Sequence, residues 1–260
     1  MKRIQILLTA TLISFYASAQ SLSPQVIASA GGYASSGGVS LSWTLGETFT
    51  TTLQNGNNIL TQGFQQPFIE LRILNLKAFL QGYYIGSGAM QPVLANQFVA
   101  GATGLESDTI YVELHDAMNP STLIASTTAL LMTDGSAVAS FKANAGSYYV
   151  AIKHRNTIQT WSAAPVALPS TYDFTTSADQ AFFGNMIDVY GENIWSFYTG
   201  DLNQDDFIDI FDFPAYDFDN QNFVAFAYAN TDMNGDGFVD IFDFPIFDFN
   251  NQNFVFAMYP

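Results

Sequence analysis

The sequence predicts a mainly β protein with a small N-terminal β unit, a β-sandwich and a C-terminal module that carries short helices. Three observations point to this class. Aromatic residues make up 15% of the chain and charged residues only 12%, which suits compact β modules better than disorder. Several short segments alternate apolar and polar residues, as half-buried strands do. The C-terminal region repeats itself.

The N-terminus has the composition of an export signal. Lys2 and Arg3 precede a mostly apolar run, residues 4–15, and Ala17-Ser18-Ala19 supplies small residues before a cleavage site. We therefore expect residues 1–19 to be a signal peptide that is removed near Ala19. The mature protein is then secreted, to the medium or the cell surface. The run is too short to span a bilayer, and the absence of cysteine excludes disulfides.

Residues 20–67 are predicted to form the small β unit. Val39, Leu41 and Trp43 alternate with polar residues, which indicates a strand with one buried face. Asn55-Gly56 is a favourable hairpin turn between residues 49–53 and 59–64.

Residues 70–198 are predicted to form one β-sandwich, either immunoglobulin-like or transthyretin-like. Leu74 and Leu76 begin an alternating run, and Asp134-Gly135 is expected to join residues 127–132 to 137–142 as a hairpin. Further strand-like segments are 109–115, 147–154, 157–161 and 194–198. Short strands at this spacing are typical of sandwiches, but the topology is left open.

Residues 199–260 contain the repeat. Residues 201–229 align without gaps on 232–260, and 18 of the 29 aligned positions are identical. A helix tolerates proline in its first turn. We therefore expect Pro214 and Pro245 to begin short helices that run through Phe218 and Phe249. The stretches that follow, 222–228 and 253–259, are expected to be extended.

Charge separates this region from the rest of the chain. The formal net charge is −16, and residues 156–260 hold sixteen acids but no Lys or Arg. Nucleic acid and anionic membranes require basic surface, so neither is an expected partner. A solvated acidic face would explain the charge, but the positions of the acids indicate cation binding instead.

Each repeat carries oxygen side chains at positions 1, 3, 5, 9 and 12 of a twelve-residue loop, the spacing of EF-hand-type calcium loops. Position 7 contributes its backbone carbonyl whatever its side chain is. We predict one Ca²⁺ per loop, two ions in all. The predicted ligands of the two loops are Asp201, Asn203, Asp205, Phe207 (carbonyl), Asp209 and Asp212, and Asp232, Asn234, Asp236, Phe238 (carbonyl), Asp240 and Asp243.

These duplicated loops resemble those of the dockerin family. Like dockerins, the loops end in aspartate, at Asp212 and Asp243, and the segment before the first loop does not read as a helix. The resemblance implies the same twelve metal ligands. Dockerins present small polar residues to their cohesin partners, whereas here the corresponding pairs are Ile210-Phe211 and Ile241-Phe242. A classical cohesin is therefore not an expected partner, and the partner is an unknown protein or glycan.

The whole layout also resembles a group of secreted bacterial multi-module proteins. The likeness rests on S-W-T-L-G-E at 42–47, V-E-L-H-D at 112–116 and K-H-R-N at 153–156, together with the signal peptide and the loops. It implies export but no particular activity.

Other chemistry-bearing residues do not form a recognisable catalytic motif. His115 and His154 lack the further ligands that a zinc site needs, so both are interpreted as strand residues. Four acids around one strand are interpreted as a solvated face, and the alternative is that they include a glycosidase pair; they are Glu106, Asp108, Glu113 and Asp116. The three tryptophans are interpreted as core residues, and the alternative is a sugar-stacking platform; they are Trp43, Trp161 and Trp195.

The sequence thus predicts a non-catalytic, secreted calcium-binding protein that acts as a binding, adhesion or assembly module. The alternative is an accessory component of extracellular polysaccharide degradation, either carbohydrate-binding or attached to an enzyme. A hydrolase is a weaker third interpretation.

Overall fold

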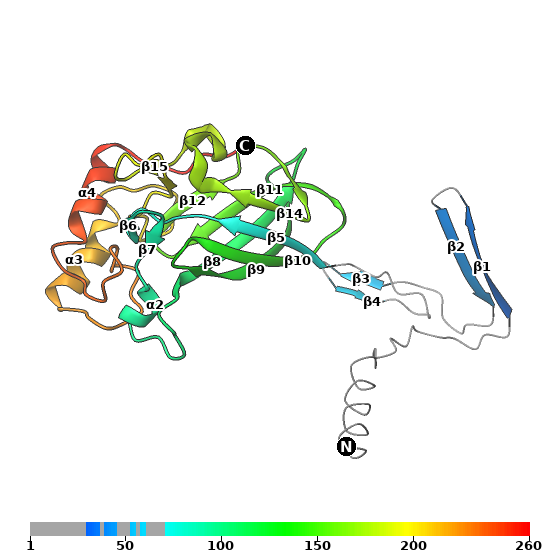
Figure 1. Ribbon diagram of the computed structural model, residues 1–260, viewed down its shortest axis with the longest axis horizontal. Helices are drawn as coiled ribbons and strands as arrows, with labels where there is room; N and C mark the ends of the chain where they lie inside the picture. Colours follow the sequence, from blue (N-terminus) through cyan, green and yellow to red (C-terminus); the bar gives the residue numbers. More distant parts are fainter. Residues whose placement is uncertain (1–29, 37–38, 46–52, 56–57, 61–70) are drawn as a thin grey trace, which may run out of the picture. The chain divides into compact units, whose positions relative to one another are not determined.

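The computed structural model describes residues 30–36, 39–45, 53–55, 58–60 and 71–260 (Figure 1). The chain divides into two compact units, Met1–Phe68 and Ile69–Pro260. The expected signal peptide lies outside the described residues.

The first unit contains two antiparallel strand pairs. β1 (Ala30–Ser36) pairs with β2 (Val39–Leu45), and β3 (Leu53–Asn55) pairs with β4 (Asn58–Leu60). The strand predicted around Leu41 and the hairpin predicted at Asn55-Gly56 are therefore both present. Residues 49–52 and 61–64 of the predicted hairpin lie outside the described residues.

A five-stranded antiparallel sheet forms one layer of the second unit. Its order is β12–β11–β8–β9, with β13 also paired to β11. The strands are β8 (Glu106–Asp116), β9 (Leu123–Met132), β11 (Gly146–His154), β12 (Thr157–Trp161) and β13 (Val166–Leu168). Ile110, Val112 and Leu114 on β8 are fully buried. Because side chains alternate along a strand, Glu113 and His115 lie on the opposite, outer face.

A three-stranded sheet forms the other layer, in the order β10–β5–β14. β5 (Leu71–Lys77) pairs antiparallel with β10 (Ser136–Lys142) and parallel with β14 (Ser170–Asp173). Leu74 and Leu76 of β5 enter the core, as their alternation predicts. This core contains side chains from both sheets, which defines a β-sandwich.

The predicted hairpin at Asp134-Gly135 is wrong in its pairing. The turn forms, and Gly135 N donates to Met132 O at 2.9 Å. However, β9 pairs with β8 while β10 pairs with β5, so the turn carries the chain from one sheet to the other. A tight turn fixes the local reversal of the chain but does not choose the partner of each strand.

Short elements lie between β5 and β8 and between β14 and the repeats. They are β6 (Tyr84–Gly86), β7 (Ala89–Met90), α2 (Val93–Asn96), η1 (Phe174–Thr176), η2 (Ala178–Gln180), η3 (Phe182–Gly184), β15 (Ile187–Asp188) and β16 (Trp195–Ser196). The helix α2 lies beside β8.

Each repeat consists of an acidic loop followed by a helix, α3 (Phe213–Gln221) or α4 (Phe244–Gln252), drawn in orange and red in Figure 1. Both helices have proline in the first turn, as expected, and both extend three residues past the predicted Phe218 or Phe249. A second core joins the repeats. Its equivalent pairs are Leu202 and Met233, Ile208 and Val239, and Tyr216 and Phe247.

Candidate functional site: the paired acidic loops

The first loop, Asp201–Asp212, is folded by its own side chains. The Asp201 carboxylate accepts the backbone N–H of Asp205 at 3.2 Å and of Asp206 at 3.1 Å. Asn203 Oδ1 also accepts Asp205 N, at 2.9 Å. Such side-chain to backbone bonds fold the loop tightly, which is why Asp and Asn are favoured here.

Asp212 closes this loop. Its Oδ1 accepts Leu202 N at 2.7 Å and Asn203 N at 3.0 Å, and its Oδ2 accepts Asp209 N at 2.9 Å. The last predicted ligand is therefore held against the first ones, although eleven residues of chain separate position 12 from position 1.

The second loop, Asp232–Asp243, has the same arrangement. Asp243 Oδ1 accepts Met233 N at 2.6 Å and Asn234 N at 2.9 Å, and its Oδ2 accepts Asp240 N at 2.9 Å. Asp232 accepts Gly235 N at 2.8 Å and Gly237 N at 2.9 Å. The repeat in sequence is therefore also a repeat in hydrogen bonding.

Burial of four of these carboxylates raises the free energy of their ionised form. Asp201, Asp212, Asp232 and Asp243 are all at most 1% exposed, and no Lys or Arg follows Arg155 in the sequence. Loss of hydration raises the pKa of Asp201 and of Asp243 to about 7, and it raises the pKa of Asp212 and Asp232 as well. Without a cation, the loops therefore retain protons that an exposed aspartate would lose.

The donor chemistry of each loop suits calcium, which takes six to eight oxygen ligands, including carboxylates, amides and carbonyls. In the described part of the chain, no group of three or more His, Cys, Asp or Glu side chains is arranged to hold a metal ion. The oxygens of each loop instead accept N–H groups of the same loop. Several carboxylate oxygens thus face inward on one short turn, and the predicted sets also use an Asn amide and a Phe carbonyl.

The loops are joined by short β-type contacts to the segments that follow the helices. Phe207 bridges Phe256, and Phe238 bridges Ala225. Ile208 N donates to Val255 O at 2.9 Å, and Val239 N donates to Val224 O at 2.8 Å. Each repeat thereby supplies the strand partner of the other repeat's loop, so the two loops depend on each other.

The second loop also rests on the sandwich. Gln97, directly after α2, donates from Nε2 to Asp232 Oδ2 at 2.6 Å, and Asn96 Nδ2 donates to Gly235 O at 2.8 Å. A Cβ on Gly237 would lie 2.5 Å from Asn96 O, so the two backbones touch there.

A buried ionic cluster lies behind this contact. Asp108 of β8 accepts His154 Nε2 at 3.0 Å, Arg155 Nε at 2.9 Å and Tyr228 OH at 2.6 Å. Arg155 also donates to Gln97 Oε1 at 2.9 Å and to the carbonyl of Ala229. Burial alone would raise the pKa of Asp108, but the charges of His154 and Arg155 keep it well below its usual range.

The remaining sequence candidates lie apart from the loops. Asp108 is in the cluster just described, Glu106 and Asp116 accept hydrogen bonds from nearby turns, and Glu113 contacts His115 and Lys153. His115 packs on the almost fully buried Trp161. The side chain of Trp43 lies outside the described residues. Gln97 had no sequence signal, because an isolated polar residue shows no spacing, and the K-H-R-N segment at 153–156 gave no role to Arg155.

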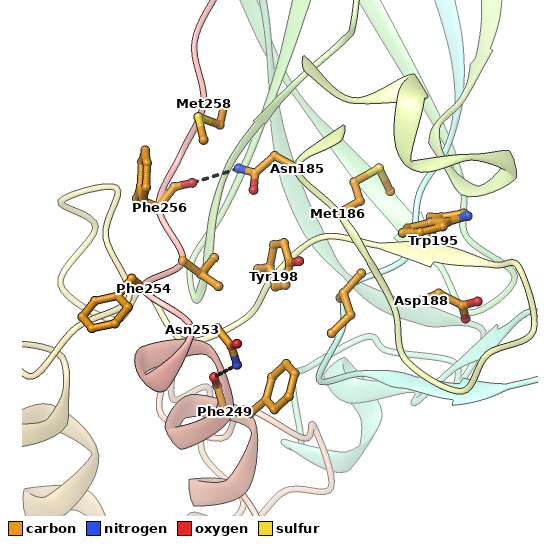
Figure 2. A pocket seen from close by; sticks show the side chains of 12 residues that line it. Asn185, Met186, Asp188, Trp195, Tyr198, Phe249, Asn253, Phe254, Phe256 and Met258 are labelled. Atoms are coloured by element: carbon orange, nitrogen blue, oxygen red, sulfur yellow. Dashed lines mark hydrogen bonds between the residues drawn. The ribbon is translucent and has the colours of Figure 1, made fainter. Parts of the chain in front are cut away.

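An aromatic groove of about 580 Å³ runs beside the second repeat (Figure 2). Figure 2 shows Phe249 of α4 and Phe254 and Phe256 after it on one side, with Tyr198 and Trp195 on the other. Phe254 is 82% exposed. Asn185 Nδ2 donates to Phe256 O at 2.9 Å and fixes the wall. Exposed aromatic surface of this extent is typical of interaction sites.

Comparison with known proteins yields few matches. No protein-family model matches the chain, and neither does any curated protein. Two similar crystal structures are interface mutants of a type II cohesin–X-dockerin complex from Acetivibrio cellulolyticus. The C-terminal interface mutant has a TM-score of 0.40 and 16% identity, over 69% of this chain and 94% of that chain. The N-terminal interface mutant has 0.41 and 14%, over 70% and 97%.

The predicted membership of the dockerin family is wrong. No protein-family model, and so no dockerin model, matches the chain. The physical reason is that an EF-hand-type loop needs this spacing to bring its oxygens together, whatever family carries the loop, so the spacing does not identify a family. Among the described helices, none is long and apolar enough to cross a membrane.

Proposed function

We propose that this protein is a secreted, non-catalytic module for protein binding or assembly, and that two calcium ions hold its C-terminal repeat. The observation that carries the proposal is the burial of four carboxylates in two loops with the same hydrogen bonds. No basic residue of the repeat can neutralise them. Leaving such charges uncompensated is costly, and a divalent cation removes that cost.

One ion in each loop would be held by the predicted sets. These are Asp201, Asn203, Asp205, Phe207 (carbonyl), Asp209 and Asp212, and Asp232, Asn234, Asp236, Phe238 (carbonyl), Asp240 and Asp243. A cation that binds the folded loop and not the unfolded chain adds its binding free energy to stability. Because the loops pair with each other's strands, both ions would stabilise one cooperative module.

The aromatic groove is the proposed docking surface for the partner. Its aromatic side chains offer apolar area, and the surrounding repeat is acidic and lacks Lys and Arg. A protein surface that combines apolar side chains with Lys or Arg is complementary to it. We therefore propose a basic, apolar protein partner.

Titration calorimetry of the chelator-stripped mature chain tests the calcium proposal. We expect two Ca²⁺ ions per chain and a melting temperature that rises with calcium. Asp212→Asn and Asp243→Asn should each remove one ion. The matched controls are Asp217→Asn and Asp248→Asn, at equivalent exposed positions of α3 and α4 whose carboxylates bind only helix neighbours. A metal-free sample whose heat of mixing and melt ignore added Ca²⁺ would refute the proposal.

Capture from the extracellular fraction tests the docking surface. The wild-type chain should retain a protein that moderate salt releases, since charge complementarity is screened by salt. The Phe254→Ser variant, which removes a largely exposed aromatic side chain from the groove, should no longer capture that protein. Phe183→Ser, at an exposed phenylalanine outside the groove, should keep it. Equal capture by both variants would exclude the groove as the docking site.

A further inference from the structure

A second cavity, of about 350 Å³, lies on the outer face of the five-stranded sheet, and we call it the sheet pocket. Its floor comes from three adjacent strands. Glu113 of β8 and Trp161 of β12 both pair with Ala151 of β11, so the two side chains lie on the same face on either side of it. The other side chains that the argument uses are His115, Lys153, Gln159 and Tyr259.

The polar side of the sheet pocket is fixed. Glu113 Oε2 contacts Lys153 Nζ at 3.1 Å and His115 Nε2 at 3.2 Å. His115 Nδ1 is in turn 2.8 Å from Pro120 O, which holds the ring. The Glu113 side chain is only 17% exposed, and its second oxygen has no partner among the described residues. The sheet pocket therefore presents a positioned acceptor beside an ammonium donor.

One buried polar atom beside the sheet pocket also lacks a partner. Trp161 is 5% exposed, and its Nε1 makes no hydrogen bond in the described part of the protein. Gln159 is 7% exposed and adds an amide to the lining of the sheet pocket. An unpaired buried donor costs about 1–3 kcal/mol. Natural cores rarely leave such groups unpaired unless a ligand or water completes them.

The apolar side of the sheet pocket is aromatic. Tyr259 lies 5.9 Å from Trp161 between ring centroids, and His115 lies 4.3 Å from Trp161. The hydroxyl of Tyr259 bonds the side chain of Asp206 in the first loop, which fixes this wall. The ligand that suits such a site has one apolar face and several hydroxyl groups.

We propose that the sheet pocket binds one terminal hexose or pentose unit of a neutral glycan. A carboxylate, an amide and an ammonium group can bond neighbouring sugar hydroxyls, while the aromatic rings pack on the C–H face. The volume is that of a small-ligand site. The net charge of −16 disfavours acidic glycans, because long-range repulsion opposes them. This function goes beyond the proposed calcium-held module, since no predicted metal ligand lines the sheet pocket.

The test is titration of the mature chain with neutral oligosaccharides, namely cellotetraose, xylotetraose, mannotetraose and galactotetraose, with tryptophan fluorescence and ligand-observed NMR as readouts. We expect saturable binding of at least one of them. Glu113→Gln and Gln159→Ala should each weaken it at least tenfold. Glu106→Gln, on the same strand but outside the sheet pocket, should leave it unchanged. Thermal melts show whether each variant is folded, and Lys153→Met replaces any variant that is not.

Three outcomes overturn the proposal. One is the absence of saturable binding of every neutral probe up to about 10 mM, weaker than specific recognition requires. The second is binding that survives Glu113→Gln, Gln159→Ala and Lys153→Met. The third is binding of tetragalacturonate alone, which would indicate an anion site. Running each titration with calcium and with chelator separates this proposal from the calcium proposal, because a calcium-insensitive melt refutes only the latter.

Discussion

Gln97 donates a 2.6 Å hydrogen bond to Asp232, the residue at position 1 of the second acidic loop. Gln97 is itself 2% exposed and accepts a bond from Arg155. The sandwich therefore holds one end of the second loop. At the equivalent position of the first loop, the Asp201 carboxylate accepts backbone N–H groups of its own loop, from Asp205 and Asp206. The two loops share a fold, but the first residue of the second loop is also bonded to a side chain of the sandwich.

This difference predicts unequal calcium affinities. Gln97→Leu should weaken the second site about tenfold, because Asp232 loses a donor that fixes its orientation and the buried carboxylate is left less satisfied. The first site should change by less, because the hydrogen bond of Gln97 goes to the second loop and the first loop would feel its loss only through the shared β-type contacts. Calorimetry on the variant, and on Asp243→Asn to leave only the first site, resolves the two. An equal loss at both sites would contradict the role given to Gln97.

The Asp108 cluster should dominate the stability of the sandwich-to-repeat contact. Asp108→Ala leaves Arg155 and His154 buried without their carboxylate, which typically costs about 3–5 kcal/mol. Denaturant unfolding should show this loss together with earlier proteolysis of residues 199–260. Asp116→Ala is the matched control, because Asp116 accepts turn N–H groups at an exposed site. Its cost should be about 1 kcal/mol or less. Equal costs for the two variants would argue against the cluster.

Calcium should reverse the pH dependence of stability. In the metal-free chain, Asp201 and Asp243 have a pKa of about 7 against an ordinary 3.8. The folded state therefore binds more protons than the unfolded state between these values. That contribution is complete below the unfolded pKa and is lost as pH rises through about 7. Calcium needs ionised ligands, so its stabilisation is instead lost as pH falls through the same window.

Melting curves at pH 5 and pH 8 test this reversal. With chelator the protein should melt at a higher temperature at pH 5, and with excess Ca²⁺ at pH 8. The lowered pKa of Asp108 places the titration of that carboxylate below this range. Parallel trends under both conditions would rule out coupled titration of the loops.

The sequence predicted those strands and turns that depend on the spacing of residues close together in the chain. The alternation around Leu74 and Leu76 identified a strand and its buried face, since side-chain direction follows directly from strand geometry. The twelve-residue spacing identified both turns, and Asp212 and Asp243 do close them. Family membership did not follow, because the same spacing serves an EF-hand-type loop in whatever family carries it.

The sequence could not predict what depends on distant partners. Gln97 meets Asp232 across 135 residues, and Asp108 meets Tyr228 across 120. No periodicity marks such residues. The turn at Asp134-Gly135 shows the same limit, since its residues specify a reversal while the pairing of β9 and β10 is set by the sheets around them. The sheet pocket likewise depends on the C-terminal Tyr259 reaching Trp161.

Position 6 of the loops gives a matched test of the contact between the second loop and α2. Asp206 and Gly237 both have positive φ, +72° and +95°. Asp206 already has a Cβ in this conformation, so Asp206→Ala adds little left-handed strain, whereas Gly237→Ala adds about 1–2 kcal/mol. Only at Gly237 does the new Cβ also meet Asn96 O, at 2.5 Å. Gly237→Ala should therefore destabilise the chain relative to Asp206→Ala by at least about 1 kcal/mol beyond that strain, as measured by denaturant unfolding. A difference no larger than the strain would mean that the second loop does not rest on α2 in solution.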